Sequence, residues 1–574
     1  MALKRLFGTL VVLQERHPRM VLALLVAFLG VAGLANIPPI DRDEPHFAQA
    51  ARQMLETGDF IDIRFQDAPL YEKPVLTYWL QAGSAALFSG PEPNEIWAYR
   101  LPSVLAVLVA TLLTYELGLA LFDRRAALPA ATLFASMLLV QSQAHQARAD
   151  ALLLASMLGT VLPLARIYVS RTVPAAAPST RMTALFWVSL AAAILIKGPV
   201  VPVLIALAIA TLVLLDRDWR WLEPLRLRWG VPLFLLVLLP WPIAIFNLHG
   251  ASFFVQAWQT DILPKLVSAQ ESHGAPPLAY ALSAPLTLWP ATLLLPSAVE
   301  FAWRNRRDLS VRFCVAMILP GWLLFELAPT KLPHYVLPLV PMLALLMTAR
   351  GNPCTLQSRS RMSSRIGVTL FLLASLLIVS AVPFALVRLG SGLDVVAVVG
   401  TLTLLASVIL AAVAAWRGGV ERSAGTAAWC GGVERSAGTA AWCGILASVL
   451  IFGVTMPRLQ RLWVAERAAH AVQSISAPQA PTLVVGYHEP SLVFLLGTRT
   501  RFVDAGEAAA ALQAGPSTAA IVASSGAPEF VRAARARGVD AQQISTIDGI
   551  DPVHGRPIEL GVWSVRPRPG ASRS

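Results

Sequence analysis

The sequence predicts a polytopic α-helical membrane protein with a small α/β domain at its C-terminal end. Of its 574 residues, 56% are hydrophobic and only 14% are charged, and the mean hydropathy is +0.61. Soluble folds need a far more polar surface than this composition provides. The apolar residues also recur in stretches of about twenty, the length that a helix needs to cross about 30 Å of hydrocarbon. We therefore expect most of the chain to lie in a lipid bilayer.

About thirteen membrane spans are expected, all within residues 1–457, which we assign to a transmembrane domain. The N-terminal segment has a charged start and an apolar run, as a cleaved signal peptide would, but no small-residue cleavage site follows, so we expect it to be retained. The predicted spans are 20–37, 101–122, 126–144, 151–168, 184–196, 199–215, 230–247, 279–298, 313–328, 333–349, 366–387, 395–416 and 444–457.

Arginine placement predicts the topology of these spans. Alternate loops are rich in arginine, and the positive-inside rule assigns such loops, and the N-terminus, to the cytoplasm. The loop 38–100 and the segment 249–277 then face outward, as does the C-terminus, because the number of spans is odd. The formal charge of +12 follows from these scattered arginines, so no nucleic-acid partner is expected. The arginine-rich loops lie near 124–125, 166–181, 217–228, 304–312, 350–365 and 417–435.

Residues 458–574 have the composition of a soluble domain. Short strand-like runs, LVVGY, LVFLLG, AAIVAS and ELGVWSV, alternate with Ala/Arg-rich stretches of helical character. This pattern predicts a small α/β domain outside the membrane. Just before it, residues 418–430 are repeated without change at 431–443. We interpret the repeat as a recent tandem duplication that lengthens a cytoplasmic loop and carries no chemistry.

The first outward loop is too long and too acidic to be a simple connector. Residues 41–100 hold ten acidic side chains against five basic ones, and 47–55 has the pattern of an amphipathic helix. Connections between helices usually need only a few residues, so we expect this loop to carry function, a plain solvated loop being the alternative.

Two groups of charges in this loop are candidates for chemistry. Asp41, Asp43 and Glu44 directly follow the first span, where a carboxylate can act as a general base or bind a divalent metal. Glu72 and Lys73 lie where the loop returns to the membrane, and a lysine ammonium suits a lipid phosphate. Ordinary surface charge is the alternative for each group taken alone.

Further ionisable residues are predicted to reach the same outer face. Arg148 and Asp150 begin the fourth span, and Lys197 ends the fifth. Ionisable groups at membrane depth are costly, so they are usually functional or paired, and a structural contact between Arg148 and Asp150 is the alternative. No nucleotide-binding, zinc-protease or serine-hydrolase motif occurs in a fitting context.

The segment PTKLPHYVLPLVP adds Lys331, His334 and Tyr335 to this face. Its prolines are expected to break the helix and shape a cavity. The histidine alone is more typical of a structural hydrogen bond than of a metal ligand. Together these groups predict a site at the outer membrane interface that combines carboxylates and cations.

The motifs of the first 345 residues follow a familiar order. D-E is followed by FAQAARQMLETGDF and by Y-E-K-P-x-x-x-Y-W, and then by YRLP, ARAD, IKGP, LPWP, HGAPPLAY with a later WP, and KLPHYVLP. This series resembles GT-C glycosyltransferases, specifically the bacterial lipid A aminoarabinose transferases and the related protein O-mannosyltransferases. The resemblance covers over half of the chain.

The resemblance implies transfer of a sugar from an undecaprenyl-phosphate carrier to a lipid A-like or protein acceptor, at the periplasmic face of a bacterial inner membrane. It implies a catalytic carboxylate at Asp43 with Glu44 beside it, and a further acidic pocket position at Asp150. Glu72 is similar to a metal-binding glutamate, so a divalent metal ion is a possible cofactor. The carrier phosphate is expected at Lys73, Lys265 and Tyr335, with Lys331 and His46 beside them.

The sequence departs from the family pattern at one position of the site. His46 stands where many members have an arginine near the phosphate, which shifts the expected phosphate contacts towards Lys73 and Lys265.

Four other functions remain as alternatives. A transporter or flippase would show two related halves and charges at the bilayer midplane. A polysaccharide polymerase or ligase is expected to place its main groups in a late periplasmic loop, and a membrane anchor for the C-terminal domain would not need the outward charges. Among transferases, a protein O-mannosyltransferase-like enzyme differs only in its acceptor.

Overall fold

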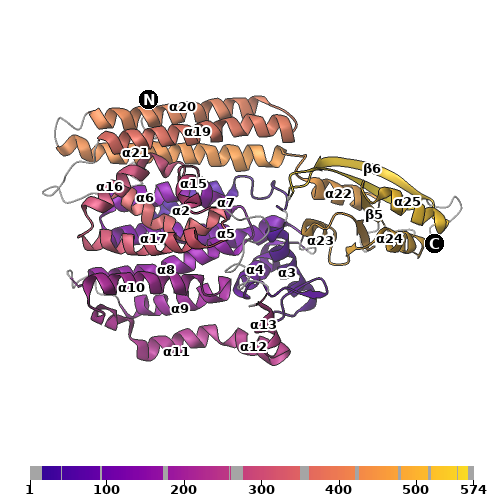
Figure 1. Ribbon diagram of the computed structural model, residues 1–574, viewed down its shortest axis with the longest axis horizontal. Helices are drawn as coiled ribbons and strands as arrows, with labels where there is room; N and C mark the ends of the chain where they lie inside the picture. The colour runs from indigo at the N-terminus through magenta and orange to yellow at the C-terminus, as the bar shows by residue number, and fades with distance from the viewer. Residues whose placement is uncertain are drawn as a thin grey trace.

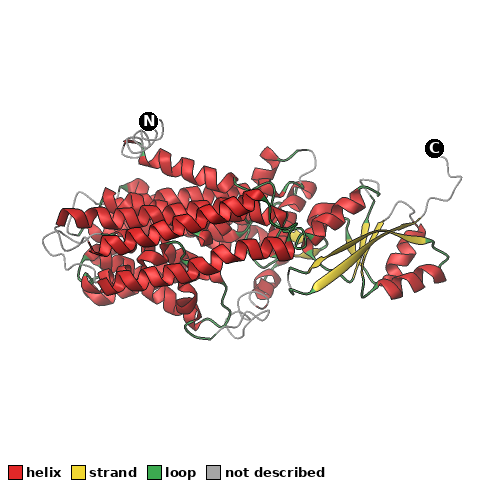
Figure 2. Cartoon of the chain, turned by 90° about the horizontal axis from the view of Figure 1, so that it is seen from above, coloured by secondary structure: helices red, strands yellow, loops and turns green. Residues whose placement is uncertain are grey.

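The computed structural model has two parts, a bundle of long helices and a C-terminal α/β domain that projects from one end of it (Figures 1 and 2). It describes residues 16–40, 42–90, 94–171, 179–257, 259, 276–349, 361–420, 426–475, 480–514, 519–552 and 554–565. The helical segments bury a large apolar core and a small separate cluster around Tyr115, and the α/β domain has its own core on each face of its sheet.

Seven helices in the described part of the chain are long and apolar enough to cross a membrane. Many of their large apolar side chains, such as Leu376 and Leu410, are exposed on the surface of the bundle, as expected for side chains in contact with lipid. The seven are α5 (Ile96–Leu121), α8 (Ala149–Val169), α9 (Thr180–Lys197), α17 (Leu309–Leu327), α19 (Arg361–Leu389), α20 (Val395–Val420), and α21 (Thr426–Ser448) continued by η7 (Val449–Thr455) and η8 (Met456–Arg458).

Other predicted spans are bent or short. Three helix pairs meet at angles of 62°, 43° and 113°, and Pro240 starts the second helix of the 43° pair, where its ring cannot continue the preceding helix. The pairs are α6 (Arg124–Ser136) with α7 (Leu138–Ala144), α11 (Leu227–Leu238) with α12 (Pro240–His249), and α15 (Ala279–Thr287) with η4 (Ala291–Leu294) and α16 (Leu295–Arg304). The shorter apolar helices are α2 (Pro18–Val31), α10 (Val200–Asp216), and η5 (Pro333–Leu339) with α18 (Val340–Thr348).

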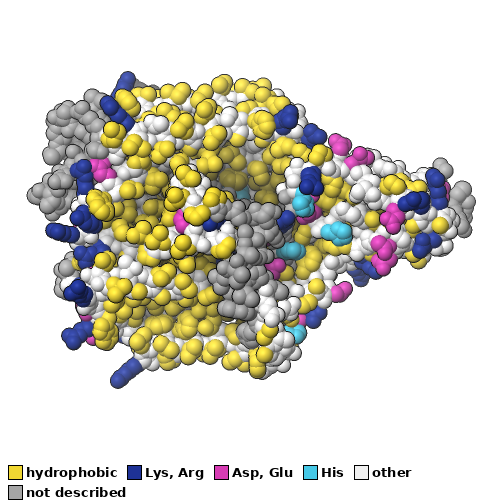
Figure 3. Space-filling model, in the orientation of Figure 1, with side chains coloured by type: hydrophobic (Ala, Val, Ile, Leu, Met, Phe, Trp, Pro, Cys, Tyr) yellow, Lys and Arg dark blue, Asp and Glu magenta, His cyan; other side chains and the backbone are white. Residues whose placement is uncertain are grey.

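The arginine-rich loops meet at one end of the bundle. Arg171 after α8, Asp216 at the end of α10 and Arg312 in α17 form one ion-pair network, which ties three of these loops together. Figure 3 shows lysine and arginine side chains along the end of the bundle opposite the C-terminal domain, with a wide apolar belt beside them. The charge pattern is therefore asymmetric along the axis of the bundle, as the positive-inside pattern predicts.

The first loop folds into a layer between the bundle and the C-terminal domain. It contains α3 (Asp43–Thr57), the hairpin of β1 (Arg64–Phe65) and β2 (Ala68–Pro69), and α4 (Leu76–Phe88). The amphipathic segment predicted at 47–55 lies within α3. Helix α4 was not predicted, and its Tyr78 packs in the core against Phe47, with ring centroids 5.3 Å apart.

The C-terminal domain contains a five-stranded sheet of order β4-β3-β5-β7-β6. Strands β4, β3 and β5 are parallel to one another, and β7 is antiparallel to both of its neighbours, β5 and β6. One apolar core contains α22 and α23, and the other contains α24 and α25. The run LVFLLG, predicted as a strand, lies mostly in α23, because Pro490 favours the start of a helix. The elements are α22 (Val464–Gln473), β3 (Thr482–Val485), α23 (Pro490–Leu496), β4 (Arg501–Phe502), α24 (Ala505–Ala514), β5 (Ala519–Ala523), α25 (Ala527–Ala536), β6 (Ala541–Ile550) and β7 (Pro557–Val565).

The tandem repeat differs from its prediction as a loop. Its second copy, 431–443, is helical throughout and forms most of α21. Its alanines favour a helix, and Ala437, Ala440 and Ala441 are buried against the bundle. The remaining short elements are η2 (Arg220–Leu225) and α13 (Ser252–Ala257).

Candidate functional site

The centre of the candidate site is Asp43, in the first turn of α3. A carboxylate at this position is favoured by the positive end of the helix dipole. The Asp43 side chain is 53% exposed, and its Oδ2 accepts a hydrogen bond from Nη2 of Arg148, the residue that precedes α8. Asp43 is therefore a solvent-accessible carboxylate that is paired with Arg148.

Glu44, the neighbour of Asp43, points into the protein. It is 1% exposed, and its two oxygens each accept a hydrogen bond of 2.8 Å from Arg100, which is itself fully buried. The backbone N–H groups of Ile40 and Ala147 also donate to it, at 2.9 and 2.7 Å. With its oxygens used in this way, Glu44 fixes the start of α3 to α5 and to the segment before α8. We therefore assign Glu44 a positioning role in place of the catalytic role expected from the sequence.

A second carboxylate, Asp150, lies behind Arg148. Lys197, in the last turn of α9, donates to its Oδ1 at 2.5 Å. Nε of Arg148 lies 4.0 Å from its Oδ2, and Nε2 of His334 lies 3.8 Å from the same oxygen. The structure thus pairs Asp150 more closely with Lys197 than with Arg148, the contact weighed from the sequence.

Helix geometry favours this pairing. Asp150 stands at the N-terminal end of α8 and Lys197 at the C-terminal end of α9, and each charge is favoured by the dipole of its own helix. Gly198, at φ +69°, then ends α9. Arg148 is the link between the two carboxylates, since it touches Asp43 and faces Asp150.

The η5 segment closes the site on another side. Nζ of Lys197 lies 5.7 Å from the ring centroid of Tyr335, and the rings of His334 and Tyr335 meet edge to face. Lys331, two residues before η5, donates from Nζ to the carbonyl of Ala328 at 2.8 Å. Tyr335 and His334 are thus brought to the charged cluster, as the shared outer face predicts.

His46 lies one turn along α3 from Asp43 and packs edge to face on Phe65 of the hairpin, with ring centroids 4.6 Å apart. Burial lowers the pKa of His46, and the nearby carboxylates of Glu72 and Asp43 oppose this shift only in part. Glu72 is exposed, and the neighbouring Lys73 donates to the backbone carbonyl of Glu72 at 2.9 Å. The loop's return to the membrane is therefore close to α3.

Three of the sequence-based expectations need separate comment. Lys265 and Asp41 lie outside the described residues. A metal site would need several ligands around Glu72, but no group of three or more His, Cys, Asp or Glu side chains suited to an ion occurs in the described ranges. The expected divalent metal thus has no assembled ligand set among them.

One network of the loop was missed by the sequence reasoning. Asp62, which is buried, accepts a hydrogen bond from Tyr71 at 3.2 Å and pairs with Arg64 at 2.7 Å, and its Oδ1 lies 3.2 Å from Nε2 of His249. Burial and the Asp62 carboxylate raise the pKa of Tyr71 to about 12. Trp241 also donates to the carbonyl of Ile61. The number of charged residues in the loop was the one sign of this network in the sequence. Nothing in the spacing of these residues indicates that they contact α12.

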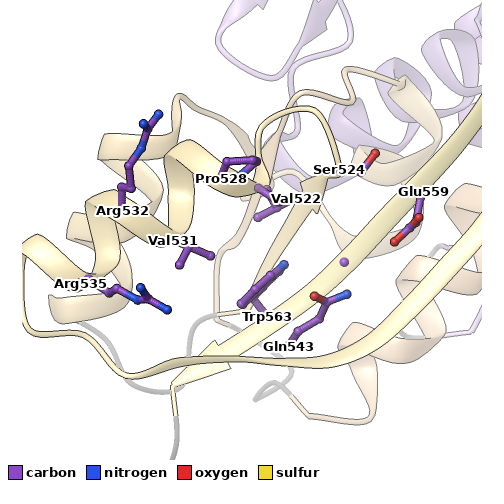
Figure 4. A pocket seen from close by; sticks show the side chains of 11 residues that line it. Val522, Ser524, Pro528, Val531, Arg532, Arg535, Gln543, Glu559 and Trp563 are labelled. Carbon is purple, nitrogen blue, oxygen red and sulfur yellow. The ribbon is translucent and has the colours of Figure 1, made fainter.

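A surface recess in the C-terminal domain is distinct from this cluster. It has a volume of about 510 Å³ and lies between α25 and the sheet, where Trp563 and Gln543 form its floor and Arg535 its rim (Figure 4). The charged cluster instead lies where α3, α8, α9 and η5 converge.

The fold and the charged cluster define a class of protein, a multi-pass membrane protein with the GT-C architecture. The structure superimposes on ArnT from Cupriavidus metallidurans in the apo state with a TM-score of 0.70 and 17% identity, covering 95% of this chain and 97% of that one. The same protein bound to undecaprenyl phosphate gives a TM-score of 0.66 with the same coverage. These matches establish the fold.

Sequence comparison gives the particular relatives. Residues 72–243 match the family described as dolichyl-phosphate-mannose-protein mannosyltransferase. The chain is 30% identical over 382 residues to an undecaprenyl phosphate-alpha-4-amino-4-deoxy-L-arabinose arabinosyl transferase of Pseudomonas aeruginosa, and 28% identical over 320 residues to one of Proteus mirabilis. The resemblance to GT-C glycosyltransferases predicted from the motifs is confirmed. The alignments cover 62% and 54% of this chain, and the chain spans 64% and 55% of the length of these relatives.

Proposed function

We propose that this chain is a membrane glycosyltransferase that takes a sugar from a polyprenyl-phosphate carrier and transfers it to a lipid A-type acceptor. The observation that carries the proposal is the pairing of an exposed carboxylate, Asp43, with Arg148, beside a second pair of Asp150 and Lys197, at one end of the bundle. A site of this kind offers a base for an acceptor and positive charge for a departing phosphate. The relatives named above act on an undecaprenyl-phosphate sugar, which is a donor of this class.

The proposed reaction is a substitution at the anomeric carbon. An acceptor oxygen attacks that carbon, Asp43 orients this oxygen and accepts its proton where it carries one, and the bond to the carrier phosphate breaks. The phosphate leaves with the bonding electrons, and nearby cations offset its growing charge. Arg148 is suited to this role because its guanidinium lies against the exposed Asp43, and a guanidinium has five N–H donors in a geometry that suits phosphate oxygens.

Lys73, Lys331 and Tyr335 are proposed as further contacts to the carrier phosphate, and Lys265 as another from outside the described residues. Lys331 and Tyr335 belong to the segment that closes on Lys197, and Lys73 ends the loop that returns towards α3. The steps proposed here use these cations as the positive charge that faces the departing phosphate. Glu72 remains the proposed contact for a divalent ion should one bind.

The charged cluster is proposed to face the periplasm of a bacterial inner membrane, with the C-terminal domain on the same side. The arginine-rich end of the bundle, opposite this domain, supports that orientation (Figure 3). In intact spheroplasts, the variant Ser524→Cys, changed at an exposed position, should be labelled by a membrane-impermeant maleimide more strongly than the parent protein. Labelling only after lysis would reverse the orientation.

The experiment that tests the activity is transfer in liposomes. The full-length protein is reconstituted with undecaprenyl phosphate-linked 4-amino-4-deoxy-L-arabinose and lipid A, and the acceptor is examined by mass spectrometry. A gain of one sugar on lipid A supports the proposal. The family match over 72–243 favours a protein acceptor as the second candidate, so a gain on added envelope proteins instead would establish that function. No transfer to either acceptor would overturn the proposal.

A further inference from the structure

Helix α3 is held between the membrane helices and the C-terminal domain. Figure 1 shows α23 of that domain beside α3, although more than 400 residues separate them in the chain. Three residues of α3, Gln49, Arg52 and Glu56, form hydrogen bonds with the domain, and they recur at the helical spacing of three and four residues and so share one face. The contact is therefore made by a whole helical face.

Thr498 forms the middle of this contact. Its hydroxyl accepts a hydrogen bond from Nε2 of Gln49 at 2.7 Å and donates one to Oε2 of Glu56 at 2.7 Å. Arg52, between these two residues on α3, pairs with Glu56 at 2.7 Å and donates from Nη1 to the carbonyl of Phe494 at 2.8 Å. One hydroxyl thus joins two points of α3 that are two turns apart.

The β1–β2 hairpin fixes α3 to the same segment from a second direction. Gln53 of α3 donates to the carbonyl of Gln66 at 2.6 Å and accepts from the N–H of Gln66 at 2.9 Å. Gln66 has φ of +55°, a strained backbone conformation for a residue other than glycine, and its side chain donates to the carbonyls of Thr498, at 3.0 Å, and of Thr500. The strained turn is therefore held by contacts on both of its sides.

Apolar and charged contacts complete the attachment. The rings of Tyr99 in α5 and Phe494 in α23 are both fully buried and meet edge to face, with centroids 5.4 Å apart. At the other end of α3, Arg42, directly before Asp43, lies close enough to Glu489 for their charges to attract. The attachment thus extends from the residue before Asp43 to the last turn of the helix.

We propose that residues 494–500 of the C-terminal domain are a clamp that sets the position of α3, and through it the position of Asp43. The inference rests on the proposed function, because it concerns the carboxylate assigned to the reaction. Asp43 itself makes no described contact with the clamp, so the clamp residues are positioning residues. The C-terminal domain therefore contributes to the activity through its contacts with α3.

Glu44 anchors the first turn of α3 through Arg100, so the clamp residues set the direction in which α3 leaves that anchor. Asp43 stands beside the anchor, where a rotation of the helix changes the direction of its side chain. A misplacement of about 1 Å can lower a rate by about a hundredfold. A partial loss of the clamp should therefore lower kcat by at least about tenfold while leaving the carrier-binding cations in place.

The test uses two clamp variants and one control in the full-length protein. Thr498→Val keeps the side-chain shape but removes the hydroxyl, and Gln66→Asn tolerates the positive φ but is too short to reach Thr498. Thr498→Ser is the matched control, because it keeps the hydroxyl. Three quantities are measured for each in nanodiscs: kcat, KM for the carrier-linked sugar, and hydrogen exchange of the α3 amides.

The expected result is a fall in kcat of about tenfold or more in both clamp variants, with KM within about twofold of the parent value and faster exchange confined to α3 and the hairpin. Thr498→Ser should keep the kcat, KM and hydrogen exchange of the parent protein. Unchanged kcat, or a fall in kcat without faster exchange in α3, would overturn the clamp. If the parent protein transferred no sugar, the proposed function would fail, while the exchange measurement would still decide whether the clamp holds α3.

Discussion

Replacing Glu44 separates its positioning role from catalysis. In Glu44→Ala, Arg100 keeps three backbone carbonyl acceptors, those of Leu34, Ile37 and Pro38, but loses the only carboxylate within its described contacts. Breaking one side of a buried ion pair costs about 3–5 kcal/mol, because a charge remains buried without compensation. That cost is a large part of the about 5–15 kcal/mol by which proteins are commonly stable.

The assay for this prediction is the thermal unfolding midpoint in detergent, followed by tryptophan fluorescence and by the fraction of monodisperse protein after heating. Glu116→Ala is the control, because Glu116 pairs with the exposed Arg19 at 2.6 Å and with the partly exposed Arg166 at 3.7 Å, and exposed pairs each contribute less than about 1 kcal/mol. We expect a large fall in the midpoint for Glu44→Ala and a small one for Glu116→Ala. A Glu44→Ala protein of parental stability that had lost transfer activity would refute the reasoning and return Glu44 to a catalytic role.

Three further predictions follow from the same contacts. Lys197→Met removes the closest cation of Asp150, so transfer should fall at least about tenfold and Lys197→Arg should retain more of it; equal activities in both variants would contradict the pairing. Burial lowers the pKa of His46 in the folded protein, so the stability that neutral His46 provides is complete above its unfolded pKa of about 6.5 and is lost as the pH falls towards its folded pKa. Between pH 7.5 and 5.5, His46→Phe should therefore lose less stability than the parent protein. Equal losses in the two proteins would show that His46 does not titrate in this way. Because the proposed steps use cations, chelation by EDTA should leave transfer intact, whereas a loss reversed by Mg²⁺ or Mn²⁺ would establish a metal, for which Glu72 is the first ligand to test.

The membrane helices were predictable because their signal is local. Apolar stretches such as 366–387 give long helices, and α19 covers that prediction completely. At Pro240 an apolar stretch forms a bent pair, whereas Pro163 of α8 and Pro383 of α19 lie inside continuous helices. Neither the hydropathy nor the presence of a proline therefore predicts the bend. Helix α4 was missed because its sequence, LTYWLQAGSAALF, lies in a loop that was interpreted from its charged residues alone.

Several members of the charged cluster were also predictable, but their pairing was not. Arginine placement put Asp43, Asp150 and Lys197 on one side of the membrane, and the structure brings them into one cluster through Arg148. Glu44 stands next to Asp43 in the sequence, yet the two side chains on adjacent helical positions point to different surroundings, one exposed and one buried.

The contacts made by the C-terminal domain were beyond the sequence for a further reason. Gln66 and Thr498 are more than 400 residues apart, and each looks like an ordinary polar residue of a turn. In the C-terminal domain, LVFLLG has the composition of a strand, but it lies mostly in a helix, because the helix begins at Pro490. Partners of this kind are fixed by tertiary packing, which no local pattern reports.

The most direct test of the central claim is the transfer activity of Asp43→Asn. The substitution keeps the size of the side chain and its place at the start of α3 but removes the charge that pairs with Arg148. In liposomes with the carrier-linked sugar and lipid A, the account predicts a fall in kcat of about a hundredfold or more, with unchanged binding of the carrier and unchanged unfolding temperature. Full transfer by Asp43→Asn would contradict the claim that this carboxylate performs the chemistry.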